Sequence, residues 1–418
     1  MRRYGIFTAI LTLMAVSFFA GGLLGYKQTQ PIAALVSVIK SAEARIMALR
    51  LDELSYRKWS YGRNVSNSQW IDKIHPHVAR TDVASLISIR SPREVTRKRQ
   101  RLIDLIWRGR GLPLATRPDE VFRGISDSAF DGMRHLDRID KLEIRMRGGI
   151  IARPYVFYPK VRKKGVIIYH QGHYGHFALG RPVIERFLGE GYLVLGLSMP
   201  LLGPNSDPIE EIPRFGYIKY DYHNVLQFFQ SEDFSPLTFF LDPIIVAASY
   251  LLEQSGEPCV AMTGVSTGGW LTTFASALDT RICHSYPVAG SLPAYVRLAP
   301  PNRPNIGDFE EMPPDVLAIA NVLEFYVLAA TGKGRTHKLI YNQFDDCCYR
   351  GIGVTTFRDP VKAAVAQAGG GDFDVHIDST FIGHRISPFA AHLILHDLTA
   401  KLGSAKTLSQ RGATTPNG

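Results

Sequence analysis

Cysteine is scarce in this sequence. Four cysteines occur among its 418 residues, at Cys259, Cys283, Cys347 and Cys348. They are too few and too unevenly spaced for a disulfide framework, and no two of them form the C-x-x-C pair that zinc ribbons and thioredoxin-like redox sites require. Because a bridge between sequence neighbours is strained, we expect Cys347 and Cys348 to be free thiols or loop residues.

The chain also lacks other diagnostic patterns. It has no internal repeat, and charged residues make up only 21% of it. Its 45% hydrophobic content excludes a disordered chain, a collagen-like repeat and a small cysteine scaffold. A mean hydropathy of −0.02 excludes a polytopic membrane protein but allows one apolar segment. The length suits one large α/β domain with additions, or two ordinary domains.

One long apolar run is present, near the N-terminus. Two arginines follow Met1 and precede the stretch Ile6–Leu24, which is about long enough for a helix to cross the roughly 30 Å hydrocarbon core of a membrane. The arginines predict that the remainder of the chain lies outside the cytoplasm, in the periplasm or the extracellular space. We interpret residues 1–30 as a membrane anchor. The alternatives are a signal segment cleaved near Gly21, which would make the protein secreted, and a buried helix.

Residues 31–134 have a basic, helical pattern. Apolar spacing predicts a helix from about 31 to 54, and the sequence from Ser91 to Glu94 is typical of a capping box that opens a helix reaching Trp107. Much of the net charge of +10 lies on that second helix, in Arg93, Arg97, Lys98, Arg99, Arg101 and Arg108. These charges either contact anionic lipid headgroups or form the solvated face of an amphipathic helix. The second alternative requires an apolar face on the opposite side of the helix, and the sequence has one. No nucleic-acid motif accompanies them, so we expect no nucleic-acid partner.

From about residue 135 short apolar runs alternate with helix-length segments. The expected strands are Lys141–Met146, Ile151–Tyr158, Gly165–His170, Tyr192–Leu197, Cys259–Gly264, Ile282–Val288, Lys338–Asn342 and Phe373–Ile377. The first two are close enough to form a hairpin, and most later ones are separated by helical stretches. This alternation predicts an α/β domain over residues 135–402, with a mostly parallel, doubly wound sheet and an antiparallel pair at its start. We expect residues 403–418 to form a flexible tail.

The most informative segment is a strand that runs directly into Gly-x-Ser-x-Gly-Gly. The motif begins at Gly264, its serine is Ser266, and a helical pattern follows Gly269. A serine nucleophile at this place must sit on a sharp, strained turn, so its neighbours need to lack bulk. The N-terminus of the following helix then favours developing negative charge. We interpret Ser266 as a nucleophile rather than as part of a plain glycine-rich turn.

This segment resembles the nucleophile turn of the α/β-hydrolase superfamily, in particular of its serine esterases and dienelactone-hydrolase-like members. The resemblance covers roughly residues 135–402. The superfamily places an acid after a strand that follows the nucleophile, and a histidine after the last strand. Asp345, with Asp346 as the alternative, stands at the first place and His384 at the second. The resemblance therefore implies a triad in which Ser266 attacks, the histidine transfers the proton and the aspartate orients the imidazole.

An oxyanion hole is implied as well. Its donors would be the backbone N–H of Thr267, directly after the nucleophile, and one N–H from the loop after the third strand. We expect the latter to come from His173, with Gly172 allowing a close approach. A competing interpretation takes His170, His173 and His176 as a metal cluster, but the glycines between them do not suit a helix, and no H-x-H-x-D or H-E-x-x-H pattern occurs. We therefore expect no metal and no cofactor.

Two long insertions interrupt the expected domain, at about 200–242 and 291–334. The first contains many aromatic residues, and the second contains several prolines followed by an apolar helix at about 316–330. Insertions at the carboxyl edge of a sheet usually form caps or pocket walls. Their aromatic residues suit an acyl-binding pocket and a small core of the cap equally well.

These features predict a serine hydrolase that cleaves a carboxylic ester or a related acyl bond of a small-molecule substrate through an acyl-enzyme. An acyl peptidase and a thioesterase of the same fold use the same parts and stay open as alternatives. So does a function of another class, a catalytically inactive, membrane-anchored binding protein with a hydrolase fold, because a fold alone does not establish activity.

Overall fold

The computed structural model describes residues 64–161, 164–173, 175–220, 222–302 and 307–412, preceded by residues 38–39, 41–42, 46, 55, 58 and 61–62. The chain divides into two compact units, Met1–Asn64 and Val65–Gly418, and the candidate site lies entirely in the second. Within the described residues, no helix combines the length and the apolar character that crossing a membrane requires. The expected anchor at 6–24 and most of the expected helix at 31–54 lie outside these residues.

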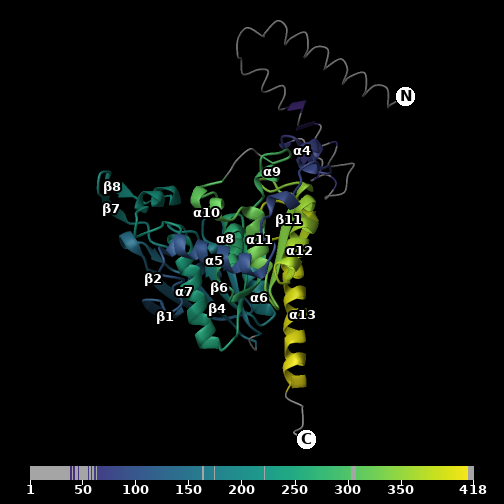
Figure 1. Ribbon diagram of the computed structural model, residues 1–418. Coiled ribbons are helices and arrows are strands. Elements are labelled where there is room, and N and C mark those ends of the chain that lie inside the picture. Colours follow the sequence, from purple (N-terminus) through teal and green to yellow (C-terminus); the bar gives the residue numbers. More distant parts are fainter. Residues whose placement is uncertain are drawn as a thin grey trace. The chain divides into compact units, whose positions relative to one another are not determined.

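A ten-stranded mixed sheet forms the centre of the second unit (Figure 1). Its strands are β1 (Glu120–Ile125), β2 (Leu136–Arg145), β3 (Ile151–Ala152), β4 (Tyr155–Pro159), β5 (Val166–His170), β6 (Leu193–Leu197), β9 (Val260–Val265), β10 (Ile282–Val288), β11 (Thr336–Phe344) and β12 (Asp372–Ile382). They lie in the order β1-β2-β4-β6-β5-β9-β10-β11-β12, and β3 pairs with β2. Every strand expected from the sequence is present. The one expected at 151–158 is divided into β3 and β4 around Pro154, which has no N–H for a ladder.

The sheet changes character across its width. Strands β1, β2, β4 and β6 pair antiparallel, whereas β6, β5, β9, β10, β11 and β12 are parallel. Parallel strands covered on both faces need apolar side chains at nearly every position, and β5, β6 and β9 are buried throughout. The prediction of a mostly parallel sheet with an antiparallel start is confirmed. The carboxyl ends of the parallel strands meet at one edge of the sheet, where α/β proteins place their ligand sites.

Helices form two groups on the sheet. One group consists of α5 (Pro92–Trp107), α7 (Thr238–Ser255), α8 (Thr267–Leu278), α11 (Val322–Ala330) and α12 (Arg358–Gln367), which contact one another in a continuous chain. The other consists of α6 (Arg181–Gly189) and α13 (Pro388–Gly412), which contact each other and strands β4, β6, β10 and β12. Helices that cover both faces explain why the parallel strands are fully apolar.

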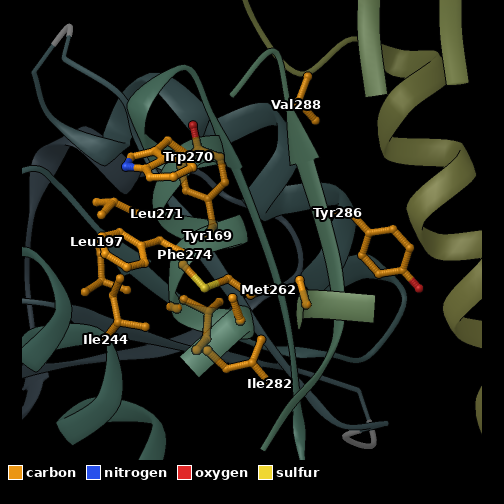
Figure 2. Packing of buried hydrophobic residues seen from close by; sticks show 14 of the residues in the cluster. Tyr169, Leu197, Ile244, Met262, Trp270, Leu271, Phe274, Ile282, Tyr286 and Val288 are labelled. Carbon is orange, nitrogen blue, oxygen red and sulfur yellow. The ribbon is translucent and has the colours of Figure 1, made fainter. Parts of the chain in front are cut away.

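The central part of the core lies around α8 (Figure 2). Trp270, Leu271 and Phe274 of α8 pack near Met262 of β9 and Ile244 of α7, and each of these side chains is at most 1% exposed. Because α8 begins directly where β9 ends, this packing fixes both arms of the turn between them. The turn therefore has little freedom to relax.

Residues 65–134 belong to the same unit as the sheet. Strand β1, which was not predicted, pairs antiparallel with β2. Helix α5 has the expected bounds, with the Glu94 N–H donating to Ser91 Oγ at 3.4 Å, and its Lys98 forms an ion pair with Glu324 of α11 at 2.8 Å. Part of the basic face of this helix thus contacts protein. The domain boundary expected near residue 134 falls inside the unit.

The two insertions fold differently from each other. The first carries a separate hairpin, β7 (Ile209–Ile212) with β8 (Gly216–Lys219), and then the 3-10 helix η6 (His223–Phe229). The second carries the short helices α9 (Ala294–Arg297) and α10 (Pro314–Ile319) before α11. The expected single helix at 316–330 is wrong. Asn321 begins a new helix there, because its side chain accepts from the Glu324 N–H while the Glu324 carboxylate accepts from the Asn321 N–H.

All four cysteines are paired, Cys259 with Cys283 and Cys347 with Cys348. The first pair links β10 to the residue before β9. Of the two alternatives expected for the adjacent cysteines, the loop placement is confirmed, since they follow β11, and the free thiols are wrong. Both of their backbone N–H groups donate to Asp345 Oδ1, at 2.8 and 2.9 Å, and the tight turn that this requires brings the two side chains together.

Candidate active site

Ser266 stands on the turn between β9 and α8. Its φ of 58° and ψ of −132° lie in a region that residues with a side chain rarely adopt. The flanking elements hold it there, since its N–H donates to the Val288 C=O at 3.1 Å and its C=O accepts from the Trp270 N–H at 3.0 Å. The strand, sharp turn and helix that a serine nucleophile needs are therefore present.

The glycines around Ser266 are required by close approach of backbone segments. A β-carbon on Gly264 would overlap the backbone of Gly268, and one on Gly268 would overlap the His170 C=O. A β-carbon on Gly269 would lie 2.8 Å from Gly290 Cα. All three contacts are with backbone atoms, which have no room to move in a packed sheet. The three glycines of the motif are thus required because the strand, the turn and the helix pack closely against the backbone at β5 and β10.

His384 lies in the loop between β12 and α13. Its Nδ1 is 2.7 Å from Asp345 Oδ2, and its side chain is only 8% exposed. This contact orients the ring, because Nδ1 then carries the proton that the carboxylate accepts. Nε2 becomes the basic nitrogen, and it is buried with no hydrogen-bond partner among the described residues. It is free to accept a proton from a hydroxyl.

The two neighbouring aspartates differ in their surroundings. Asp345 is fully buried, and its Oδ1 accepts the two cysteine N–H groups while Oδ2 faces His384. Asp346 is exposed. The structure therefore brings Asp345 to the imidazole and leaves Asp346 at the surface.

Asn342 holds the loop that carries the histidine. It is fully buried on β11, and its Nδ2 donates to the backbone C=O groups of Gly383 and Arg385, both at 2.8 Å. The two bonds bracket His384 and fix its backbone from both sides. Sequence reasoning did not assign this role, because the partners are backbone atoms about 40 residues away.

Ser266 and His384 line the same cavity, whose volume is about 640 Å³. Apolar side chains dominate its wall, namely Leu179, Val183, Val265, Phe381, Ile386 and Ala391. Arg186 and Arg385 also line it, and both are exposed. The described lining residues include no carboxylate and none from either insertion. The expected acyl-pocket role of the insertions' aromatic residues is thus not found at this cavity.

The expected oxyanion-hole residues lie beside the nucleophile. A β-carbon on Gly172 would lie 2.6 Å from Ser266 Cβ and 2.7 Å from the Val265 C=O. The loop backbone therefore passes directly against the serine, and only glycine fits there. Thr267 is fully buried, with its Oγ1 3.2 Å from His173 Nδ1. The structure brings Gly172, His173 and Thr267 together at one side of Ser266.

His170, the last residue of β5, and the histidines of the loop that follows have separate surroundings. His170 is buried, its Nδ1 lies 2.7 Å from the Gln171 C=O, and burial lowers its pKa to about 4. His176 caps the 3-10 helix η5 (Phe177–Gly180), where its Nδ1 accepts from the Ala178 N–H at 2.8 Å. The metal cluster considered from sequence, formed by His170, His173 and His176, is not assembled.

His173 instead belongs to a group that sequence reasoning missed. We name it the acid–imidazole cluster, and its members are His173, His223, Asp308 and Glu310. Their ligand-type atoms all lie within 4.8 Å of one another. The rings of His173 and His223 stack with centroids 4.5 Å apart and an interplanar angle of 4°. The last three residues lie in the insertions without any recognisable motif, and the spacing Asp308-x-Glu310 is the one local signal.

The two imidazoles of this cluster have different basicity. Burial acts to lower the pKa of His173, but the Glu310 carboxylate outweighs it and the pKa is raised. For His223, burial and the stacked His173 together lower the pKa to about 4. Burial raises the pKa of Glu310. The cluster thus combines buried His223 and Glu310 with His173 and Asp308, which are partly exposed.

No protein-family model and no curated protein matches the chain. Solved structures resemble it. For a methylesterase the TM-score is 0.50 at 13% identity, over 77% of this chain and 66% of that one. For an acetyl xylan esterase from Paenibacillus sp. R4 the TM-score is 0.48 at 15% identity, over 76% and 98%. For acetyl xylan esterase 1 from Thermoanaerobacterium sp. JW/SL YS485 the TM-score is 0.45 at 15% identity, over 77% and 97%.

Identities this low bear on the fold alone. The fold also follows from the molecule itself, because a parallel sheet with an antiparallel start has a serine on the turn after β9, an acid after β11 and a histidine after β12. The chain has the fold of the α/β-hydrolase superfamily.

Proposed function

We propose that the protein is a serine hydrolase that cleaves a carboxylic ester or a related acyl bond through an acyl-enzyme on Ser266. One observation carries the proposal. The strained serine and a histidine with a free, buried Nε2 line one cavity, and the histidine's other nitrogen is 2.7 Å from a buried carboxylate. Nucleophile, base and orienting acid are the parts that acyl transfer needs.

Acylation would begin with attack of Ser266 Oγ on the substrate's carbonyl carbon. His384 Nε2 takes the hydroxyl proton, and Asp345 stabilises the resulting imidazolium without itself becoming protonated. Negative charge then develops on the former carbonyl oxygen. The backbone N–H groups of Thr267 and His173 are the proposed donors to it. The imidazolium gives its proton to the leaving alkoxide as the tetrahedral intermediate collapses.

Deacylation would repeat these steps with water in place of the serine hydroxyl. His384 removes a proton from the water, the oxygen attacks the acyl carbon, and the serine leaves with the proton returned from the ring. The buried imidazole and the apolar cavity wall limit competing solvent around the charged intermediate.

A fluorophosphonate probe tests the proposal directly, because it labels only an activated serine. We expect the full-length protein to be labelled at Ser266, and Ser266→Ala and His384→Ala to abolish labelling. Ser126→Ala, an exposed serine outside the cavity, is the matched control and keeps full labelling. Absence of labelling in the folded parent protein, or labelling that survives Ser266→Ala, would overturn the proposal and favour an inactive binding protein.

The acyl group and leaving group separate the remaining alternatives. The measurement is kcat/KM for three classes of substrate, which are p-nitrophenyl esters of increasing chain length, acyl thioesters and acylated amino-acid amides. We expect esters to be the best of the three classes. A thioesterase or an acyl peptidase would show the reverse order while still requiring Ser266.

A further inference from the structure

The acid–imidazole cluster joins three segments that are distant in the sequence. His173 comes from the loop after β5, His223 from the start of η6 in the first insertion, and Asp308 and Glu310 from the second insertion. His173 and Glu310 are 137 residues apart in sequence, and His223 and Asp308 are 85 apart. The donor set is two imidazole nitrogens and two carboxylate oxygens.

Four of the six distances among these atoms are close to those expected around one ion. An ion in the plane of both imidazoles also requires the stacked rings of His173 and His223 to tilt apart. His173 Nε2 lies 2.8 Å from Glu310 Oε1 and 3.5 Å from Asp308 Oδ2. His223 Nε2 lies 3.4 Å from Glu310 Oε1 and 3.2 Å from Asp308 Oδ2. Ligand atoms about 2.0–2.1 Å from a tetrahedral ion are about 3.3–3.4 Å from each other, and the four measured distances scatter around that edge length.

The charges in the cluster are not balanced by other residues. Glu310 is 1% exposed, and its Oε2 has no hydrogen-bond partner among the described residues. Within the same part of the chain, neither Asp308 nor Glu310 pairs with a lysine or an arginine. With both imidazoles neutral, as metal ligation requires, the two carboxylates give the cluster a charge of −2, which a divalent ion would cancel. Glu310 is the buried member of the pair, whereas the Asp308 side chain is 30% exposed.

Neighbouring groups hold the cluster in place. The Trp270 indole N–H donates to the Glu310 C=O at 2.8 Å, and Tyr222 O–H donates to Asp308 Oδ2 at 3.2 Å. Thr267 Oγ1 lies 3.2 Å from His173 Nδ1 and 3.1 Å from its Nε2. Metal-bound histidines and carboxylates usually have such outer partners, which fix their orientation.

We propose that His173, His223, Asp308 and Glu310 bind one divalent transition-metal ion of the zinc type. Two imidazoles exclude a site built for Ca²⁺ or Mg²⁺, which take oxygen ligands. A tetrahedral set of two nitrogens and two oxygens suits Zn²⁺. The site goes beyond the proposed hydrolase function and does not depend on it.

Such an ion would hold the loop and the insertions in position and would take no part in the reaction at Ser266. His173 belongs to the loop that passes beside Ser266, and the other three ligands belong to the insertions. One ion would therefore fasten both insertions to that loop. Because four protein ligands fill a tetrahedron, no coordination position is left for substrate, as in structural zinc sites.

The test uses the full-length protein, stripped with a chelator and then dialysed separately against Zn²⁺, Mg²⁺ and Ca²⁺, with bound metal measured by mass spectrometry. We expect about one Zn²⁺ per chain and no retention of Mg²⁺ or Ca²⁺. His223→Ala and Glu310→Gln should lower the Zn²⁺ affinity about tenfold or more. His77→Ala, an exposed histidine outside the cluster, should leave it unchanged.

A second measurement distinguishes a loss of metal binding from misfolding and from a loss of catalysis. Co²⁺ bound in place of Zn²⁺ should give the intense visible absorption of tetrahedral coordination in the parent protein and in Ser266→Ala, whose active site is disabled. Loss of labelling at Ser266 with metal binding intact would overturn the hydrolase proposal alone. Zn²⁺ stoichiometry near zero in the folded parent, or unchanged affinity in folded His223→Ala and Glu310→Gln, would overturn the metal site.

Discussion

The active-site cavity and the acid–imidazole cluster are built in opposite ways. The triad candidates stand at the ends of β9, β11 and β12, so the sheet itself sets their positions. The cluster takes three of its four residues from insertions and is held to the domain by single contacts such as Trp270 with Glu310. The charges are also opposite, with arginines at the cavity and carboxylates in the cluster. The positions of the triad are thus set by the sheet and not by the insertions, while His173 and Thr267 connect the two regions.

Ser266→Ala should separate the two regions most strongly. Removing the hydroxyl leaves the turn and the cluster intact, so kcat/KM for an ester should fall by about 10⁴-fold or more. Thermal unfolding and Zn²⁺ binding should be unchanged. Hydrolysis rates and calorimetry on the same preparation check this, and a parallel loss of metal binding would show that the two regions are coupled.

Gly172→Ala should damage the cavity from the side of the loop. Its new methyl group would meet Ser266 Cβ at 2.6 Å, which forces the loop and its N–H donors away from the nucleophile. We expect kcat to fall by about 10²-fold, the scale of a lost oxyanion-hole donor, with a smaller change in KM. Steady-state kinetics test it, with circular dichroism to verify the fold. Unchanged kcat would place the oxyanion donors elsewhere.

Thr267→Val probes the contact between the two regions. The threonine hydroxyl donates to Glu311 Oε1 at 2.7 Å and lies near both nitrogens of His173, while its backbone N–H stays available to the substrate. Glu311 keeps its ion pair with Arg297 but loses the donor to Oε1, which should cost about 1–3 kcal/mol in the free energy of unfolding. Chemical denaturation measures the loss.

Thr273→Val is the matched control for that variant. Thr273 is buried on the same helix, and its hydroxyl contacts only the Gly269 C=O among the described residues, at 3.3 Å. We expect a loss of under about 1 kcal/mol, since the helix keeps its own backbone bonds. Equal losses in the two variants would mean that the Glu311 contact contributes nothing specific.

The arginines at the cavity predict a preference for anionic substrates. Replacing Arg186 and Arg385 together by glutamine should reduce kcat/KM for a p-nitrophenyl hemisuccinate several-fold, since exposed charge pairs contribute about 1 kcal/mol or less each. The rate with uncharged p-nitrophenyl acetate should not change. Arg123→Gln, exposed and outside the cavity, is the control, and equal effects on both esters would exclude charge recognition.

Where the first insertion leads into α7, the expected effect appears only in stability and leaves the rate unchanged. Burial raises the pKa of Asp242 to about 6, although Trp107 Nε1–H donates to it at 2.8 Å. A carboxyl whose pKa is raised on folding contributes stability below its unfolded pKa and loses it as the pH rises through about 6.

Asp242→Asn removes this pH dependence while keeping an oxygen for the Trp107 bond. The variant should match the parent at pH 4 and exceed it by about 1–3 kcal/mol at pH 8. Denaturation at the two pH values tests the sign, and the exposed Asp137→Asn should show no such difference. Greater stability of the parent at pH 8 would contradict the raised pKa.

The comparison between the active site and the acid–imidazole cluster also explains which features could be predicted from the sequence. The strand pattern, Ser266, His384 and Asp345 were identified because each is tied to a local pattern of strand, turn and helix. Such patterns follow from steric requirements, as at Gly264 and Gly268, and can be recognised in the amino-acid sequence alone.

What was missed depends on contacts between distant segments. Strand β1 is a short, mostly exposed edge strand without clear alternation, and Asn342 acts only through backbone groups of another loop. The acid–imidazole cluster requires the two insertions to meet, and no spacing in the sequence encodes that meeting. The pairing of Cys347 with Cys348 likewise arises from a turn around a buried carboxylate.

The pairing of β1 with β2 has a practical consequence for any shortened form of this protein. A fragment that begins at residue 135, where the strand–helix alternation starts, would remove β1 and α5 and leave the ladder groups of β2 exposed along one edge. Unprotected edges of this kind recruit strands from other molecules. Such a fragment would retain the complete triad and still precipitate, so its inactivity would report self-association rather than faulty chemistry.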